Sequence, residues 1–199
     1  AFDKVVVNAD DTIFKKVADR YKVDFYLRPK ELGGSETRID DVIYDFMNAF
    51  PKAKYVAIIN TINPLQTSEE IKRVVNFFFS NNLDSVNTVE ERFVHGMLDG
   101  TPINFSKNEK LQKTQNLKPL QLIVYSTMMW NVETFKDAMK QHGCGLFCGK
   151  FSVVPVSRKT SILAKEPEDI LMIDSVMRNQ ASDSEGLKWD FDSQHTLSE

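Results

Sequence analysis

Short apolar runs alternate along this chain with longer segments in which apolar residues recur every three or four positions. The runs predict buried strands, and the longer segments predict amphipathic helices. The expected strands are residues 4–8 (KVVVN), 24–27, 55–59 (YVAII), 84–89, 121–127 and 151–156, and expected helices are 12–21, 37–50, 132–142 and 167–178. A further helix is expected after Thr67, because Thr67 and Glu70 have the spacing of a capping box and Ile71, Val74, Val75 and Phe78 then share one face. Such alternation favours a mainly parallel sheet. We therefore expect a three-layer α/β fold, a twisted sheet with helices on both faces.

The alternation is interrupted once. Between residues 90 and 118 the apolar pattern fades, and Gly96, Gly100 and Pro102 break any regular element, so we expect a small antiparallel excursion over 93–105. We predict one domain over residues 1–178, followed by a polar tail over 179–199 that has few core residues.

The composition excludes several classes of protein. The chain of 199 residues suits one core, and its net charge of −3 gives no basic footprint for nucleic acid. The apolar runs are too short to span a membrane. Two cysteines cannot form a disulfide framework, which predicts a reduced, cytoplasmic protein.

Polar residues follow the predicted strands, and in open α/β sheets ligands bind beyond the carboxyl ends of the strands. Asn60, Asn63 and Gln66 follow the strand at 55–59 and are candidates for binding a sugar acid or a base. The competing interpretation is turn chemistry, because Asn favours turns and often precedes Pro. Asp10 and Asp11 follow the first strand, where a helix N-cap explains at least one of them.

Six motifs occur in the order and at the spacing found in the CMP-sugar synthetases (acylneuraminate cytidylyltransferases), and the chain resembles that family over about residues 2–178. The motifs are VVVNADD (5–11), LRPKEL (27–32), NTINPLQ (60–66), DSV (84–86), TQNL (114–117) and SILAKEPED (161–169). Each motif alone is weak, but six in the same order are specific.

The resemblance implies a nucleotide-diphospho-sugar transferase-like fold that joins CMP from CTP to a sialic-acid-like or other 2-keto sugar acid and releases pyrophosphate. Matching positions imply that Arg28 and Ser35 contact the nucleotide. They also imply that Asn60, Asn63, Gln66 and Gln115 contact the substrate. An ion pair of Arg28 with Glu31 or Glu36, and an exposed loop position for Gln115, are the competing interpretations.

The sequence departs from the family in two places that matter for CTP. The family's opening strand and phosphate-binding loop have no counterpart after Phe2, and its pair of Mg²⁺-binding aspartates is replaced by Leu163 and Lys165. Either the sequence is part of a longer protein, or the chain is a diverged relative that binds a nucleotide, sugar or protein partner without catalysis. Lys165 could also place an ammonium near phosphate in place of the metal.

Two further expectations follow from the resemblance. Residues 92–118 match a segment that reaches over a neighbouring subunit, which predicts a homodimer. Without the family's first strand, two internal strands would expose unpaired backbone groups, unless the strands rearrange, a partner inserts or more sequence precedes them.

One local cluster invites a metal interpretation. His142, Cys144 and Cys148 offer three zinc-type ligands, but a structural zinc site uses four, and no second pair lies nearby. We favour two reduced cysteines at a turn between a helix and a strand.

Overall fold

The computed structural model describes residues 2–181, and the polar tail predicted for 179–199 lies largely outside this range. Nine strands are present in the described residues: β1 (Val6–Ala9), β2 (Asp24–Leu27), β3 (Tyr55–Ile59), β4 (Ser85–Arg92), β5 (Met97–Leu98), β6 (Thr101–Pro102), β7 (Leu120–Ile123), β8 (Thr127–Asn131) and β9 (Phe151–Pro155). The helices are α1 (Lys15–Tyr21), α2 (Ile39–Ala49), α3 (Ser68–Ser80), α4 (Val132–His142) and α5 (Pro167–Ala181). Short 3-10 turns are η1 (Thr12–Phe14), η2 (Lys30–Gly33) and η3 (Thr114–Asn116). No described helix is both long and apolar enough to cross a membrane.

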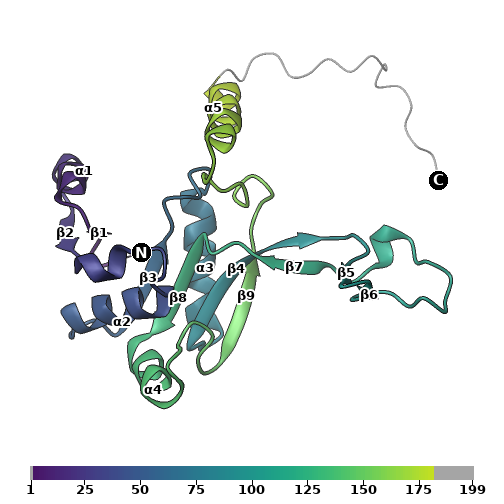
Figure 1. Ribbon diagram of the computed structural model, residues 1–199, viewed down its shortest axis with the longest axis horizontal. Coiled ribbons are helices and arrows are strands. Elements are labelled where there is room, and N and C mark those ends of the chain that lie inside the picture. Colours follow the sequence, from purple (N-terminus) through teal and green to yellow (C-terminus); the bar gives the residue numbers. More distant parts are fainter. Residues whose placement is uncertain (1, 182–199) are drawn as a thin grey trace.

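The main sheet has five strands and two covered faces, as predicted (Figure 1). Helices α2 and α4 cover one face, where the core contains Ile43, Met47, Val56, Met128, Trp130, Val132, Phe135 and Cys148. Helix α3 covers the other face, where the core contains Val74, Val75, Phe78, Leu83, Val86, Met129 and Val154. The apolar strands therefore contribute to two separate cores, one on each face of the sheet.

The expectation of a mainly parallel sheet is wrong for β7 and β8. Strand β9 runs parallel to β4, but β7 and β8 both run antiparallel to β4, and β8 also runs antiparallel to β3. The cause is the excursion after β4. The chain returns from it through β7 as a hairpin partner of β4, and a bend at Tyr125 (φ 58°) then carries it into β8. The single strand predicted at 121–127 is thus two strands.

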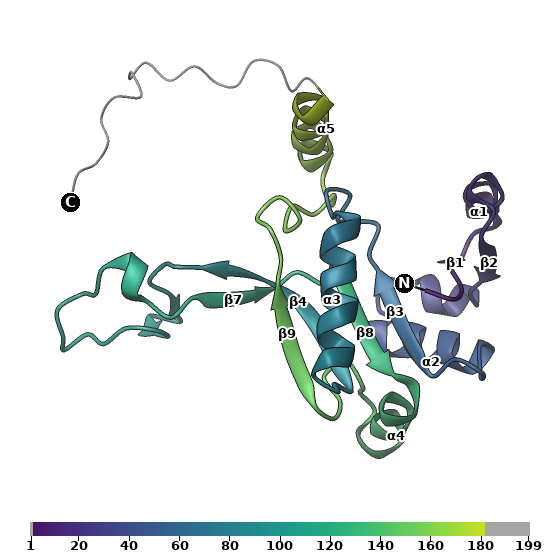
Figure 2. The ribbon, with the colours of Figure 1, turned by 180° about the vertical axis from the view of Figure 1, so that it is seen from behind.

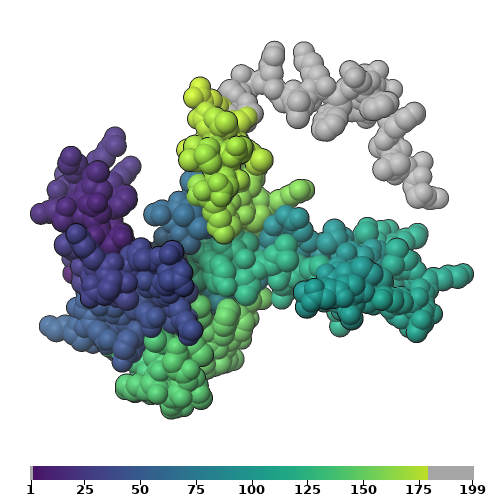
Figure 3. Space-filling model, viewed as in Figure 1, coloured from purple at the N-terminus to yellow at the C-terminus, as the bar shows by residue number. Residues whose placement is uncertain are grey.

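The excursion forms an arm. Strands β4 and β7 continue beyond the sheet, and the small β5–β6 hairpin and η3 lie at the far end, away from the helices (Figures 1 and 3). The antiparallel pairing predicted for residues 93–105 is confirmed by β5 and β6.

Strands β1 and β2 form a separate parallel pair, which is not hydrogen-bonded to the main sheet. Figure 2 shows this pair on the side of the main sheet where β3 lies. The helical connection between β1 and β2 begins with Asp11, whose carboxylate accepts the Ile13 N–H at 2.8 Å. It ends at Lys22, which adopts a left-handed conformation. The N-cap predicted among Asp10 and Asp11 is therefore Asp11.

Candidate functional site

The loop after β3 lies at the carboxyl edge of the main sheet and brings three of the predicted residues together. The Asn60 N–H donates to the Ser126 carbonyl at 2.9 Å, and the Asn60 side chain accepts from the Ile62 N–H at 3.3 Å. Asn63 is buried, and its amide donates to the Thr160 carbonyl at 2.8 Å. The Gln66 amide donates to Ser126 Oγ at 2.8 Å. The loop is thereby tied to the start of β8 and to the segment after β9.

Thr88, in the middle of β4, holds this polar cluster through its hydroxyl. Its fully buried hydroxyl accepts from the N–H groups of Ser126 and Thr127 at 3.0 and 3.2 Å and lies 3.0 Å from Ser126 Oγ. Because buried N–H groups need partners, Thr88 fixes the backbone at the start of β8. Ser126 is in turn positioned to hold Gln66.

Two amide oxygens in this cluster have no hydrogen-bond partner in the described structure: Asn63 Oδ1 and Gln66 Oε1. The orientation of Asn63 is fixed, since the Thr160 carbonyl can only accept, so the Asn63 NH₂ must face it. Both oxygens are buried, and buried polar atoms without partners are uncommon in folded proteins, so the cluster has acceptor capacity that its own residues do not use.

Glu70 links the start of α3 to the segment after β9. It completes the predicted capping box with Thr67 and also accepts from the Ser157 N–H at 2.7 Å and from the Thr160 hydroxyl. Partial burial acts to raise the pKa of Glu70, but hydrogen bonds from Thr160, Ser157 and Thr67 outweigh it and hold the pKa below its ordinary value. The carboxylate thus stays ionised and fixes the loop that carries Arg158 and Lys159.

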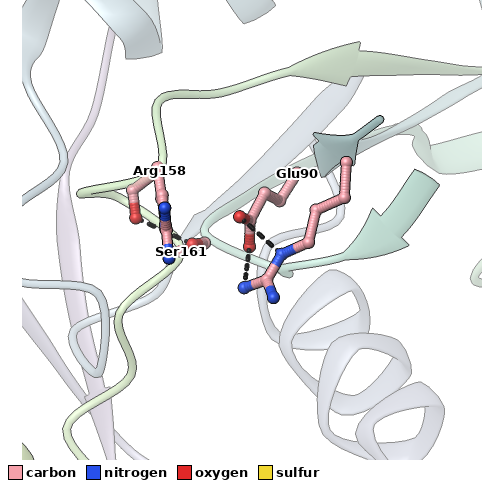
Figure 4. Close-up of polar contacts among 4 residues, drawn as sticks. Glu90, Arg158 and Ser161 are labelled. Atoms are coloured by element: carbon pink, nitrogen blue, oxygen red, sulfur yellow. Dashed lines mark hydrogen bonds and ion pairs between the residues drawn. The ribbon is translucent and has the colours of Figure 1, made fainter. Parts of the chain in front are cut away.

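Glu90 is the second acidic side chain at the carboxyl edge of the main sheet (Figure 4). Its side chain is almost fully buried and accepts from Arg92 Nε at 2.8 Å and from Arg92 Nη2 at 3.1 Å. Hydrogen bonding to Arg92 is the main cause that lowers the pKa of Glu90, and the positive charge of Arg158 contributes. Ser161 donates to the Arg158 carbonyl at 2.8 Å and holds that loop in place. From the sequence, residues 88–91 are expected at the ligand edge as the end of a buried strand, but Glu90 is given no role there and Arg158 is missed.

The remaining predicted residues lie elsewhere. Arg28 is largely buried and lies 3.5 Å from Asp10, so its ion pair is with Asp10 and not with Glu31 or Glu36. The Arg28 Nε is buried and has no hydrogen-bond partner in the described structure. Ser35 is exposed in the loop between β2 and α2. Gln115 is exposed in η3, on the arm. Within one chain, the structure separates Gln115 from Asn60, Asn63 and Gln66 (Figure 1).

The residues present do not fit a Mg²⁺ site of the kind that the resemblance implies. No group of three metal-type side chains occurs among the described residues, and this also holds for His142, Cys144 and Cys148. Leu163 has no ligand atom, and Lys165 carries a positive charge. The nearby Asp169 accepts from the N–H groups of Lys165 and Glu166 at 3.1 and 2.9 Å. Its carboxylate is therefore hydrogen-bonded to the backbone at the start of α5.

The fold of this chain is similar to that of two solved structures. It matches a 4-diphosphocytidyl-2C-methyl-D-erythritol synthase from Anaerococcus prevotii with a TM-score of 0.63 at 14% identity, covering 89% of this chain and 79% of that chain. It also matches a CMP:2-keto-3-deoxy-manno-octonic acid synthetase complexed with CTP, with a TM-score of 0.61 at 9% identity, covering 89% of this chain and 81% of that chain. The chain therefore has a nucleotidyltransferase-like α/β fold.

The sequence of this chain is similar to that of curated cytidylyltransferases. The chain is 22% identical over 142 residues to the N-acylneuraminate cytidylyltransferases of Streptococcus agalactiae serotypes V and III. The match covers 67% of this chain and 34% of each relative, so the chain spans about a third of their length. No protein-family model matches. The chain resembles the CMP-sugar synthetases, from which it has diverged.

Proposed function

We propose that this chain takes part in cytidylyltransferase-type nucleotidyl transfer, in which CTP and a sialic-acid-like or other 2-keto sugar acid give a CMP-sugar and pyrophosphate. The observation that carries the proposal is the tied polar cluster at the carboxyl edge, where Asn63 and Gln66 offer unpaired acceptors beside the basic Ser157–Ser161 segment. A sugar supplies hydroxyl donors, and a triphosphate or carboxylate needs cations. The similarity to N-acylneuraminate cytidylyltransferases supports this substrate class.

Within this proposal, Arg28 and Ser35 contact the nucleotide, whereas Asn60, Asn63, Gln66 and Gln115 contact the sugar acid. The exposed arm is proposed to carry Gln115 to a second copy of the chain, which makes the active assembly a homodimer. Support comes from large exposed apolar side chains on the arm, namely Phe93, Val94, Met97, Leu98, Ile103 and Leu111. Light scattering of the purified chain tests this assembly.

We place the activity in the cytoplasm, which agrees with the two free cysteines.

A second candidate function is a non-catalytic relative that binds a nucleotide, a sugar or a protein partner. The observation that favours it is the absence of a fitting Mg²⁺ site around Leu163 and Lys165 in the described residues. Metal ions normally neutralise the charge that develops during phosphoryl transfer. We therefore derive no catalytic step through a metal.

Thermal melting with CTP, UTP, GTP and ATP, followed by a pyrophosphate assay with several 2-keto sugar acids, separates the two functions. We expect CTP to raise the melting temperature most, because only a ligand that prefers the folded state does so. Arg28→Ala should reduce the CTP shift, whereas Asn76→Ala on the exposed side of α3 should preserve it. Stabilisation by CTP without pyrophosphate release would favour the binding relative. No stabilisation by any nucleotide would contradict both nucleotide proposals.

A further inference from the structure

A cavity of about 680 Å³ lies between α4 and the loop at residues 144–149, which leads into β9. Strand β9 runs parallel to β4, so a loop that precedes β9 lies at the opposite edge of the main sheet from the loop at residues 60–66. Figure 1 accordingly shows α4 at the end of the sheet away from α5. Small-molecule sites have volumes of about 300–1,000 Å³, and this cavity falls within that range.

Apolar side chains form much of the cavity wall. Ala138 of α4 and Leu146 pack against the core on this face of the sheet, and Cys148 belongs to that core. The Phe147 ring is 47% exposed and is held by edge-to-face contact with Phe151, at 5.1 Å between ring centroids. Exposed aromatic rings attract cations as well as apolar groups. The wall therefore suits a ligand with an apolar body.

One carboxylate in the wall is deeply buried. Asp40 lines the cavity and is only 8% exposed. Its Oδ1 accepts from the N–H groups of Gly145 and Leu146 at 2.6 and 3.1 Å, and neither hydrogen bond uses Oδ2. No basic side chain in the described part of the chain forms an ion pair with Asp40. Because buried charges are usually paired, Oδ2 of Asp40 can accept a cation that enters the cavity.

A second carboxylate adds to the negative charge around the cavity. Asp84 accepts from the hydroxyl of Thr134, a residue of the cavity wall, at 3.0 Å, and it also forms no ion pair among the described residues. Burial is the main cause that raises the pKa of Cys148 to about 11, and the charges of Asp84 and Asp40 contribute. The cavity is thus apolar and negatively charged.

We propose that this cavity binds a small organic cation, whose ammonium or guanidinium group pairs with Oδ2 of Asp40 and whose apolar body lies against Leu146 and Phe147. The carboxylate selects the charged group, and the apolar wall selects the body. Asp40 and Asp84 would repel a phosphate, so this site differs from the one proposed at the carboxyl edge. The inference does not depend on nucleotidyl transfer by the chain.

Titration of the ¹⁵N-labelled chain with phenethylamine, followed by backbone amide chemical shifts, tests the proposal. Phenethyl alcohol, in which a hydroxyl replaces the ammonium group, is the matched neutral probe. We expect saturable shifts at Gly145, Leu146 and Gly149 with the amine. The alcohol should bind at least about tenfold more weakly, because a hydrogen bond to a charged group is stronger than one between neutral groups.

Two variants test the role of Asp40. Asp40→Asn removes the charge but keeps an oxygen that can accept from Gly145 and Leu146, so it should fold. Asp41→Asn is the matched control, since Asp41 is the exposed neighbour on α2 and does not line the cavity. We expect Asp40→Asn to weaken phenethylamine binding by about tenfold and Asp41→Asn to weaken it by less than about twofold.

Three results would overturn the proposal. They are equal affinity for the alcohol and the amine, equal affinity of the two variants for the amine, and amine-induced shifts that do not saturate or that lie outside the cavity. The comparison of the two probes uses the unaltered chain, so it decides the question even if Asp40→Asn does not fold.

Discussion

Thr88→Val removes the hydroxyl that holds the polar cluster at the start of β8. The substitution keeps the volume of the side chain but leaves the N–H groups of Ser126 and Thr127, now at 3.0 and 3.2 Å from the hydroxyl, without an acceptor. An unsatisfied buried donor costs about 1–3 kcal/mol. With partial relaxation of the two groups, we expect the free energy of unfolding to fall by about 2–4 kcal/mol.

Thr127 provides a matched control. It is also fully buried, but its hydroxyl has no partner in the described structure. Thr127→Val should therefore change the free energy of unfolding by less than about 1 kcal/mol or increase it. Urea denaturation followed by circular dichroism measures both variants, with an unchanged slope as the sign of an intact fold. If Thr88→Val is no more destabilising than Thr127→Val, the cluster does not have the role assigned to it.

Three further predictions concern the rest of the molecule. Asp40→Ala should destabilise the fold by about 1.5–3 kcal/mol in urea, because it removes the buried oxygen that accepts from the N–H groups of Gly145 and Leu146 at 2.6 and 3.1 Å; a loss below about 0.5 kcal/mol would contradict this. The pKa values of Glu70 and Glu90 lie below the ordinary 4.5, so their contribution to stability is present above that pH and is lost as the pH falls through the folded pKa. Glu70→Gln should accordingly weaken the dependence of the urea midpoint on pH in that acidic range, and an unaltered dependence would count against the assignment. Burial raises the pKa of Cys148 to about 11, so iodoacetamide at pH 8 should modify the exposed Cys144 and spare Cys148, as peptide mass spectrometry can establish; equal labelling would refute the burial of Cys148.

Local patterns in the sequence predicted most of the elements. The helix expected at 132–142 coincides with α4, and the strand at 55–59 coincides with β3. The capping box of Thr67 and Glu70 was likewise visible from spacing alone. These features depend on residues a few positions apart, so a single sequence contains the necessary information.

Features that depend on long-range pairing were not predictable in the same way. The antiparallel direction of β8 follows from the return of the arm through β7, and nothing within residues 127–131 specifies it. Thr88 and Ser126 are 38 positions apart, and Asn63 and Thr160 are 97 positions apart. Sequence reasoning placed Asn60, Asn63 and Gln66 at the carboxyl edge of the sheet, where the structure has them, but it could not find the long-range hydrogen bonds that fix them.

The placement of the ligand site at the carboxyl edge is tested most directly by a CTP titration of the ¹⁵N-labelled chain, followed by backbone amide chemical shifts. We predict saturable shifts around Arg28 and Ser35 and in the Ser157–Ser161 segment, which is hydrogen-bonded to the loop at residues 60–66, with smaller changes around Cys144. Shifts confined to α4 and the Cys144 loop, or no saturable shifts at any CTP concentration, would contradict the account.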